Sequence, residues 1–484
     1  MTDVLTDVPR AGEGRGARML IDGEWIARGE VIDVRNPFDN RLVDTVPRGT
    51  AADVTRAIGA AATALEAPWP THERYDTLMR AAARLDADRD AYARTIALEG
   101  SKTIHEAQRE PVRCVTLLRL AAEEGRRLAG ETLPFDSRPG SENRVGYYFR
   151  FPVGVVGAIT PFNDPLSMVC HKVGPALAAG NAVVLKPGTA TPLSALRLAQ
   201  DLVAAGLPVG RLNVVTGRGA DLGDALVTDP RVRLVTFTGG VETGHRITRM
   251  AGIKKLSMEL GSNSPVIVMP DAALERAVPA IASGAFAQAG QNCLGVQRVF
   301  VHDAVYDDFR ERFAAHVRGL RAGSSMDECT DVCAMITVAQ AERVERWVRE
   351  AVAAGARVLA GGRREAAVVW PTVLEDVPAG AKLDCDEVYG PVVSLYRVAS
   401  LDAAIEAANR ADYGLHAAIF TESIRHAFRA IERLHVGGVI VNDSTDYRLD
   451  VMPFGGTKLS GIGREGIRFA LQEMTETRVV CFNL

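Results

Sequence analysis

Short apolar runs alternate with amphipathic segments through the middle of the chain, and this pattern predicts strands separated by helices. The runs are closed by Gly, Pro, Thr or Asn, and apolar residues at helical spacing follow the first four. Such alternation is typical of a parallel, doubly wound α/β sheet, which binds ligands at the carboxyl ends of its strands. The predicted strands are 153–159, 182–185, 212–215, 234–237 and 256–260, and the predicted helices are 166–179, 191–205, 221–227 and 242–251.

Other regions have patterns of their own. Residues 51–130 carry apolar positions at helical spacing, which predicts a run of helices. Residues 131–152 combine turn residues with one alternating strand and predict an arm outside the core, whereas the polar residues 1–18 predict a flexible tail. A second alternating region covers about 260–440, with apolar runs at 265–269, 298–301, 368–370 and 392–396 and helices at 305–319 and 339–354.

Composition narrows the class of protein. A chain of 484 residues is too long for one hydrophobic core, so two or three domains are expected. A net charge of −4 gives no reason to expect a nucleic-acid partner, and no apolar run approaches the ~20 residues of a membrane span. The N-terminus lacks a signal-peptide core, and seven scattered cysteines fit a reduced compartment, so we expect a cytoplasmic protein. Cys329 and Cys333 have no second ligand pair nearby, so no metal site is predicted.

Cys293 is the first candidate for chemistry. It lies among Gly, Gln and Asn in the segment "AGQNCLGVQRV", just before a strand-like run. A thiol in a polar loop becomes a nucleophile when its surroundings lower its pKa from about 8.5. The alternative for a lone cysteine is a small buried residue.

Two polar residues follow predicted strands. Glu259 closes an apolar strand in "SMELGSNSP", and a carboxylate there is well placed as a general base. Asn163 follows a strand in "GAITPFNDPL", and its amide is a neutral donor suited to an oxyanion. The alternatives are a surface or capping carboxylate for Glu259 and a turn residue for Asn163.

Three segments could bind a phosphate or a ribose. Lys186 follows a buried strand in "VVLKPGTATP", where a cation can hold ribose hydroxyls or a phosphate, although it can also simply extend into solvent. In "FTGGVETG", residues 237–244, a strand meets glycines and then a helix, whose free N–H groups can receive a pyrophosphate. The segment "TGRGADLG", residues 216–223, is a similar turn but not the usual G-x-G-x-x-G, and both turns can also be ordinary loops.

Together, in this order and spacing, the segments resemble the aldehyde dehydrogenase superfamily over nearly the whole chain. The resemblance includes "IDGEW" at 21–25, "EVYGPVV" at 387–393 and "MPFGGTKLSGIGREG" at 452–466. Any one motif can arise by chance, but the ordered set is very specific. It identifies Cys293 as the nucleophile rather than as a structural residue.

The resemblance implies roles for matching residues. Asn163 corresponds to the amide that holds the oxyanion with the Cys293 backbone N–H, and Glu259 to the base that activates water. Lys186 corresponds to the ligand of the adenosine ribose and Glu387 to that of the nicotinamide ribose. The residues expected to bind NAD or NADP are Thr160, Pro161, Phe162, Lys186, Thr189, Gly219, Gly223, Phe237, Thr238, Gly239, Gly240, Thr243, Glu387 and Tyr389.

The implied reaction passes through a covalent intermediate. The Cys293 thiolate attacks the aldehyde carbonyl, and the oxyanion is stabilised by preorganised donors, each worth ~10²–10³ in rate. Hydride then passes to the nicotinamide and leaves a thioester, which water hydrolyses after Glu259 takes its proton.

Three residues depart from the usual pattern. Thr189 stands where the family often has an acid that repels a 2′-phosphate, so we expect both NAD and NADP to work. Gly240 stands where Ser is usual, which removes one hydroxyl contact. Tyr389 lies where the family usually has Phe.

The expected substrate is a small polar or anionic aldehyde. Asp164 stands where many relatives have an aromatic or apolar tunnel residue, which argues against a long fatty aldehyde. Several segments resemble the branch containing lactaldehyde and phosphonoaldehyde dehydrogenases, so a phosphonoaldehyde such as phosphonoformaldehyde is one candidate. An anion would need cations near the tunnel mouth, and Arg113, His171 and Arg448 are the candidates. The alternative for Arg448 is a structural residue that pairs with Asp446 or Asp450. The predicted substrate-binding residues are Arg113, Asp164, His171, Asn292 and Arg448.

The alternatives are other substrates, another acyl acceptor and a protein without catalytic activity. Lactaldehyde, succinate-semialdehyde and general aldehyde dehydrogenases are alternatives within the same chemistry. CoA-acylating relatives generally lack the general base, so Glu259 argues against them. A catalytically silent binding or structural protein is the third class, against which Cys293, Asn163 and Glu259 together argue.

The resemblance also implies an architecture. Residues 1–127 and 148–259 would form the NAD(P)-binding domain and 260–440 the catalytic domain. The arm at 128–147 and a C-terminal strand near 467–484 would form an oligomerisation element. We therefore expect a homodimer or a homotetramer.

Overall fold

The computed structural model describes residues 8–484, and its first sheet has eight strands in the order β2-β1-β9-β8-β7-β10-β11-β23. Its parallel centre runs β9-β8-β7-β10-β11, so the strand order reverses between β7 and β10, where doubly wound sheets bind ligands. The expected α/β fold is confirmed. The strands are β1 (Met19–Ile21), β2 (Glu24–Ile26), β7 (Val155–Ile159), β8 (Ala182–Lys186), β9 (Leu212–Val214), β10 (Val232–Thr238), β11 (Lys255–Glu259) and β23 (Gly461–Ile462).

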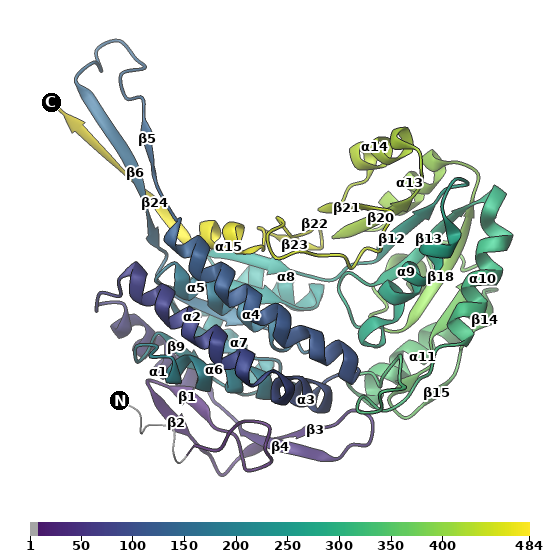
Figure 1. The fold of residues 1–484 in the computed structure, drawn as a ribbon, viewed down its shortest axis with the longest axis horizontal. Coiled ribbons are helices and arrows are strands. Elements are labelled where there is room, and N and C mark those ends of the chain that lie inside the picture. The colour runs from purple at the N-terminus through teal and green to yellow at the C-terminus, as the bar shows by residue number, and fades with distance from the viewer. Residues whose placement is uncertain (1–7) are drawn as a thin grey trace.

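Helices cover both faces of this sheet (Figure 1). One face packs against α2 to α6 and the other against α1, α7 and α8, so the central strands are buried on both sides and read as continuous apolar runs. The helices are α1 (Ala51–Ala64), α2 (Thr71–Ala87), α3 (Arg89–Glu99), α4 (Ile104–Arg126), α5 (Ser167–Ala178), α6 (Leu193–Ala204), α7 (Gly219–Thr228) and α8 (Val241–Met250).

A second sheet has the order β14-β17-β18-β13-β12-β20-β21 and is parallel except for β14. Helices α9 to α11 pack on one face, and α13 and α14 on the other. The elements are β12 (Ser264–Val268), α9 (Leu274–Phe286), β13 (Val296–His302), α10 (Tyr306–Arg318), α11 (Val338–Ala353), β14 (Arg357–Ala360), β17 (Thr372–Glu375), β18 (Val392–Val398), α13 (Leu401–Asn409), β20 (His416–Phe420), α14 (Ile424–Arg433) and β21 (Gly438–Val441).

One predicted strand of this region lies outside the sheet. The apolar run 368–370 forms β16 (Val368–Val369), which pairs only with β15 (Arg364–Glu365) in a small hairpin. The strand that joins the sheet, β17, starts after Pro371, which has no N–H to donate to a neighbouring strand.

A third sheet forms an arm that projects from the body (Figure 1). It contains β5 (Glu131–Leu133), β6 (Arg144–Pro152) and β24 (Thr475–Asn483), all antiparallel. Strand β6 ends at Pro152, where the pattern of residues 131–152 ends, whereas the architecture implied by the resemblance would end the arm at residue 147. The expected C-terminal strand begins only at Thr475, because residues before it form helix α15 (Ile467–Glu473), whose apolar side is buried.

The predicted N-terminal tail is wrong for residues 8–18, and residues 1–7 lie outside the described part. Arg10 Nη2 lies 2.9 Å from Asp201 Oδ1 and 3.0 Å from Asp88 Oδ2, and Ala11 and Ala17 are buried. The carboxylate of Asp201 is itself buried, so it needs this cation. Among residues 8–484, no helix is long and apolar enough to cross a membrane.

Candidate active site

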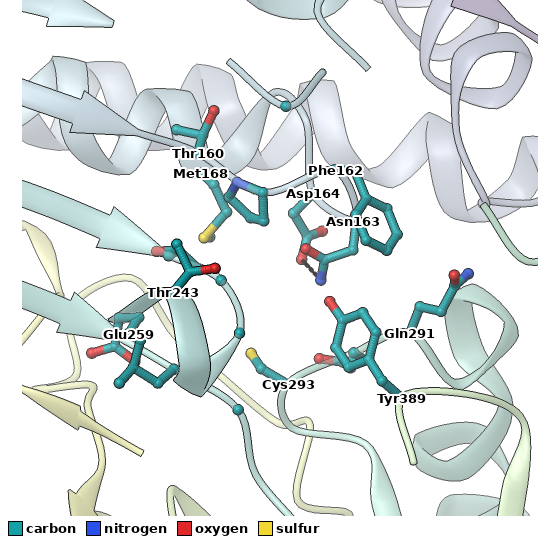
Figure 2. Close-up of a pocket in the computed structure, with 18 of the residues that line it drawn as sticks. Thr160, Phe162, Asn163, Asp164, Met168, Thr243, Glu259, Gln291, Cys293 and Tyr389 are labelled. Carbon is teal, nitrogen blue, oxygen red and sulfur yellow. Dashed lines mark hydrogen bonds between the residues drawn. The ribbon is translucent and has the colours of Figure 1, made fainter. Parts of the chain in front are cut away.

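A cavity of about 1320 Å³ lies where the carboxyl ends of β7, β10 and β11 face the loop before β13 (Figure 2). Drug-sized ligands occupy roughly 300–1,000 Å³, so this cavity has room for a larger ligand and a small second one. Every catalytic and cofactor residue predicted from the sequence lines it. Of the predicted substrate residues, only His171 does not.

Cys293 enters the cavity from a constrained loop. The turn before it, η1 (Ala287–Gly290), has positive φ at Gln288, Ala289 and Gly290. A Cβ on Gly290 would lie 2.2 Å from the Gly390 carbonyl oxygen, so only glycine fits there. This close approach fixes the nucleophile loop against residues 387–391.

The Cys293 side chain is a thiol in its resting environment. Burial raises its pKa above the usual value, and the nearby carboxylates of Asp164 and Glu259 raise it further, whereas Arg448 opposes them. Attack on a carbonyl needs the thiolate. The thiol must therefore lose its proton to a base, and a nearby cation would stabilise the thiolate that results.

Asn163 lies on the opposite wall, directly after β7, with its amide towards the same space as Cys293 (Figure 2). Its Nδ2 is 3.4 Å from Asp164 Oδ2 and 3.5 Å from Gln288 Oε1. These contacts are long for hydrogen bonds, which are usually about 2.9 Å. The amide can therefore turn to a stronger acceptor, such as an oxyanion on a carbon bound to Cys293.

Glu259 ends β11 and is buried, and its Oε2 has no hydrogen-bond partner among the described residues. Burial raises the pKa of Glu259 well above its usual value, as does Glu465, while Arg448 and Lys172 act against the rise. A carboxylate with a raised pKa and an open oxygen can take a proton from water.

Glu465 belongs to a buried ion-pair network that the sequence did not predict. Its Oε1 accepts from Lys172 Nζ at 2.9 Å and its Oε2 from Arg448 Nη2 at 3.1 Å. Although burial opposes ionisation, these two cations lower the pKa of Glu465. Glu465 is thus held as a negative charge, whereas the surroundings of Glu259 favour its neutral form.

The other part of the cavity fits a dinucleotide. The space around Gly219, Gly223 and Gly240 is open, and α8 begins directly after Gly240 with its N–H groups free to meet a phosphate. The buried hydroxyls of Thr160 and Thr238 lack hydrogen-bond partners among the described residues, and a polar ligand would satisfy them.

Two charged residues mark the ends of this dinucleotide region. Lys186 Nζ donates to the Pro187 carbonyl at 2.8 Å and to Thr189 Oγ1 at 3.2 Å, and burial lowers its pKa to about 8. Glu387 Oε1 accepts from the Ser262 N–H at 2.8 Å, and burial raises its pKa to about 7. Both side chains can hold ribose hydroxyls, as expected from the sequence.

The predicted cations of the substrate end differ in their surroundings. Arg113 lines the cavity with Nε and Nη2 at 3.0 and 2.6 Å from Asp450 Oδ1. Arg448 lines it beside the Phe454 ring and pairs with Glu465, not with Asp446 or Asp450 as the structural alternative expected. Its buried Nε has no partner among the described residues and can donate to a ligand.

His171 is not a cation at the mouth of the cavity. Its side chain is fully buried behind the lining, and its Nε2 lies 3.1 Å from Asp450 Oδ1. Burial and the charge of Arg448 lower its pKa to about 4, so it is neutral at physiological pH. We infer that His171 orients Asp450 rather than touching substrate. Asn292 does line the cavity, and its Oδ1 accepts from the Leu294 N–H.

Three residues of this end were missed by the sequence interpretation. Lys102 is a buried partner of Asp164, and Gln288 contacts Asn163. Arg109 lines the cavity without an acidic partner within ion-pair distance in residues 8–484. Arg109 and Arg113 are four residues apart on α4, so helical spacing alone places both on one face, and this signal was available.

Comparisons with known proteins identify the family of the chain. A profile of the aldehyde dehydrogenase family matches residues 25–480. The chain is 47% identical over 455 residues to aspartate-semialdehyde dehydrogenase 1 of Pseudomonas canavaninivorans, covering 94% of this chain and 97% of that protein. It is 44% identical over 480 residues to 3-sulfolactaldehyde dehydrogenase of Priestia megaterium, covering 99% of each.

Solved structures show the same fold. Aldehyde dehydrogenase 21 from Physcomitrella patens, in complex with the reaction product succinate, has a TM-score of 0.95 and 38% identity, covering 97% of this chain and 98% of that chain. NADP-dependent glyceraldehyde-3-phosphate dehydrogenase from Bacillus halodurans, complexed with NADP, has a TM-score of 0.94 and 37% identity, covering 97% and 99%. The chain therefore belongs to the aldehyde dehydrogenase family of NAD(P)-dependent enzymes.

Proposed function

We propose that this protein oxidises a small anionic aldehyde to its carboxylic acid through a thioester on Cys293. The observation that carries the proposal is one cavity lined by Cys293, Asn163 and Glu259 at one point and by Arg113 and Arg448 beside them. The first three supply a nucleophile, an oxyanion donor and a base. The two arginines supply donors for an anionic group on the substrate.

Each residue has a defined step. The Cys293 sulfur bonds to the aldehyde carbon, and the Asn163 amide and the Cys293 backbone N–H stabilise the oxygen as it becomes negative. NAD(P), when bound, supplies the acceptor for the hydride that leaves this carbon, and the carbon remains as a thioester on Cys293. Glu259 then takes a proton from water, the resulting hydroxide adds to the thioester, and the Cys293 sulfur leaves as the acid forms.

The size and charge of the substrate follow from the wall opposite Cys293. Asp164, Arg113 and Arg448 make this end polar, which disfavours a long apolar aldehyde. The names of two relatives, an aspartate-semialdehyde and a 3-sulfolactaldehyde dehydrogenase, also describe small anionic aldehydes. A phosphonoaldehyde such as phosphonoformaldehyde carries its charge in the same region and belongs to the class we propose.

Two other functions are disfavoured by Glu259. A CoA-acylating enzyme passes its acyl group to a thiol and does not need a base that activates water. Glu259 lines the cavity and its Oε2 accepts no hydrogen bond from residues 8–484, so it is available to such a water. A buried carboxyl group without a hydrogen-bond partner lowers the stability of the fold, and a catalytically silent protein would gain nothing in return. Lactaldehyde and succinate semialdehyde remain candidate substrates.

We also propose that the arm forms a homodimer or homotetramer in the cytoplasm. Val145, Phe149, Val479 and Phe482 are exposed apolar residues on β6 and β24. Such a cluster favours burial against another protein surface. Light scattering of the purified protein would give the number of copies, and a monomer would contradict this part of the proposal.

The test of function is a panel of aldehydes offered with NAD and with NADP, without CoA. We suggest propanal, lactaldehyde, succinate semialdehyde, phosphonoacetaldehyde and phosphonoformaldehyde, with NAD(P)H absorbance as the readout. We expect kcat/KM for at least one anionic aldehyde to exceed that of propanal ~10-fold or more, as one charged hydrogen bond allows. Propanal preferred over every charged aldehyde would contradict the anionic substrate, and a strict need for CoA would contradict hydrolysis.

A further inference from the structure

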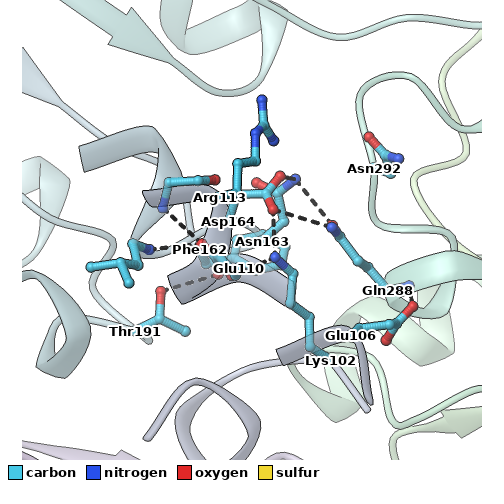
Figure 3. Close-up of polar contacts among 12 residues, drawn as sticks. Lys102, Glu106, Glu110, Arg113, Phe162, Asn163, Asp164, Thr191, Gln288 and Asn292 are labelled. Atoms are coloured by element: carbon cyan, nitrogen blue, oxygen red, sulfur yellow. Dashed lines mark hydrogen bonds and ion pairs between the residues drawn. The ribbon is translucent and has the colours of Figure 1, made fainter. Parts of the chain in front are cut away.

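The two oxygens of the Asp164 carboxylate are unequally occupied (Figure 3). Oδ1 accepts from the Lys102 ammonium and from Gln288 Nε2, the latter at 3.2 Å. Among residues 8–484, Oδ2 has only the 3.4 Å contact with Asn163 Nδ2. A carboxylate has about four acceptor positions, so Oδ2 keeps unused capacity.

Asp164 is held as an anion. Burial alone would favour the neutral acid, but the charge and hydrogen bond of Lys102 lower the pKa of Asp164. Lys102 is buried and fixed from its other side by Glu110 Oε2. Glu110 in turn accepts from the Leu166 and Ser167 N–H groups through Oε1, at 3.0 and 2.7 Å. The charge and position of Asp164 are therefore set by the scaffold.

Gln288 fixes Asp164 relative to the nucleophile loop. Its φ is 56°, a left-handed conformation that is uncommon for a residue other than Gly or Asn. In this conformation its N–H donates to Glu106 Oε1 at 2.8 Å, its Nε2 donates to Asp164 and its Oε1 accepts from Asn163. Gln288 lies five residues before Cys293, so the loop, the amide and the carboxylate form one unit.

Asp164 also lines the cavity close to the predicted oxyanion donor, Asn163. It is next to Asn163 in the chain, its side chain is 17% exposed, and it lines the cavity with Cys293 (Figure 2). A carbonyl carbon bound to Cys293 with its oxygen on Asn163 would place its first substituents close to Asp164. An ionised acceptor with spare capacity is unfavourable against a CH₂ group and favourable against a hydrogen-bond donor.

We propose that Asp164 Oδ2 accepts a hydrogen bond from a hydroxyl or ammonium group on the first or second carbon beyond the aldehyde. The substrate would then carry a donor between its aldehyde and its anionic end. This inference rests on the proposed function and names the substrate class within it. Lys102 and Gln288 are positioning residues, since they occupy Oδ1 and leave Oδ2 for the substrate.

The test uses two pairs of aldehydes that differ by one donor. Lactaldehyde and propanal differ by a hydroxyl on the first carbon, and aspartate semialdehyde and succinate semialdehyde differ by an ammonium on the second. A donor also changes the intrinsic reactivity of a carbonyl. We therefore compare the kcat/KM ratio of each pair in the wild type with the same ratio in Asp164→Asn and Asp164→Ala, which cancels that effect and any general loss of activity.

We expect the ratio of at least one pair to fall ~10- to 100-fold in the Asp164 variants, the range for a hydrogen bond to a charged group. The pair that responds identifies the donor as hydroxyl or ammonium. The matched control is Asp446→Asn, which removes another acid that lines the cavity. Its ratios should equal those of the wild type.

Unchanged ratios in the Asp164 variants, or an equal fall in Asp446→Asn, would overturn the inference while leaving the proposed function intact. A wild type that oxidises none of these four aldehydes and neither phosphonoaldehyde would instead overturn the proposed function. If the variants do not fold, product inhibition of the wild type decides: lactate should bind at least ~10-fold more tightly than propanoate. Equal inhibition constants would overturn the inference.

Discussion

Arg448 forms its ion pair with Glu465, with 3.1 Å between Nη2 and Oε2, although Asp446 and Asp450 lie only two residues away along the chain. The Arg448 side chain is 7% exposed, and its guanidinium carbon lies 3.6 Å from the centre of the Phe454 ring. The pair links the substrate end of the cavity to the acid beside Glu259, so one cation serves both regions.

Arg448→Met should therefore change both substrate affinity and pH dependence. The charge of Arg448 lowers the pKa of Glu259 and of Cys293, so its loss raises both. Because the reaction needs both groups deprotonated, the acid limb of the kcat/KM profile should move to higher pH. With propanal only this shift is expected, whereas an anionic aldehyde should also lose ~10-fold or more in kcat/KM at the optimum.

The same variant has a cost in stability. It removes one of two cations from the buried Glu465, and breaking a buried pair typically costs about 3–5 kcal/mol. Chemical denaturation would measure this loss. An acid limb that stays in place in a folded Arg448→Met enzyme would contradict the role of Arg448 in tuning Glu259.

We expect Thr189 to influence the choice between NAD and NADP. Its Oγ1 donates to the Gly217 carbonyl at 3.0 Å and lies 3.2 Å from Lys186 Nζ, so its position carries no negative charge against a 2′-phosphate. Thr189→Glu should lower the ratio of kcat/KM for NADP to that for NAD by ~10- to 100-fold through like-charge repulsion. Thr189→Val is the matched control, with a few-fold change at most. Equal ratios in wild type and Thr189→Glu would place the 2′-phosphate elsewhere.

The buried Lys186 predicts a pH-dependent cofactor preference. Burial lowers its pKa to about 8, so the free enzyme loses this positive charge as the pH rises through 8. NADP gains more than NAD from that charge, and kcat/KM reports ionisations of the free enzyme. The NADP-to-NAD ratio of kcat/KM should therefore fall above pH 8, and Lys186→Met should abolish the fall. A decline that persists in Lys186→Met would assign it to another group.

The sequence predicted the residues whose role depends on their place at a strand end. Asn163 follows β7 and Glu259 ends β11, and a parallel sheet brings such positions together at one edge. Cys293 precedes β13 of the second sheet, so its place opposite them was implied by the resemblance. Lys186 and residues 237–240 line the cavity for the same reason as Asn163 and Glu259, whereas Glu387 and Tyr389 precede β18 of the second sheet and were predicted from the resemblance. Their roles in catalysis and cofactor binding stay predictions until variants are measured.

Pairings between distant segments could not be predicted in this way. Arg448 has two acids near it in sequence but forms an ion pair with Glu465. Lys102 forms an ion pair with Asp164, which lies 62 residues away along the chain. Whether His171 is a cation depends on its burial, which only packing decides. The tail prediction failed similarly, since the partners of Arg10 lie at Asp88 and Asp201.

Gly290 should tolerate no side chain. Its φ is 67°, and a Cβ would lie 2.2 Å from the Gly390 carbonyl oxygen. Gly290→Ala therefore costs about 1–2 kcal/mol from backbone strain alone, and must also move the loop that carries Cys293. We expect a lower melting temperature and at least a ~10-fold fall in kcat, because a misplaced nucleophile is costly. Gly29→Ala, where a Cβ meets nothing within 4 Å, should be neutral.

The proposed reaction passes through a thioester on Cys293, which water hydrolyses with the help of Glu259. Mass spectrometry of Glu259→Gln, mixed with NAD(P) and an accepted aldehyde, tests it most directly, because removing a general base typically slows its step by ~10²–10⁴. We expect a burst of about one NAD(P)H per active site and an acyl group on Cys293, with neither in Glu259→Gln/Cys293→Ala. Full turnover without an adduct, or an acyl group on another residue, would contradict it.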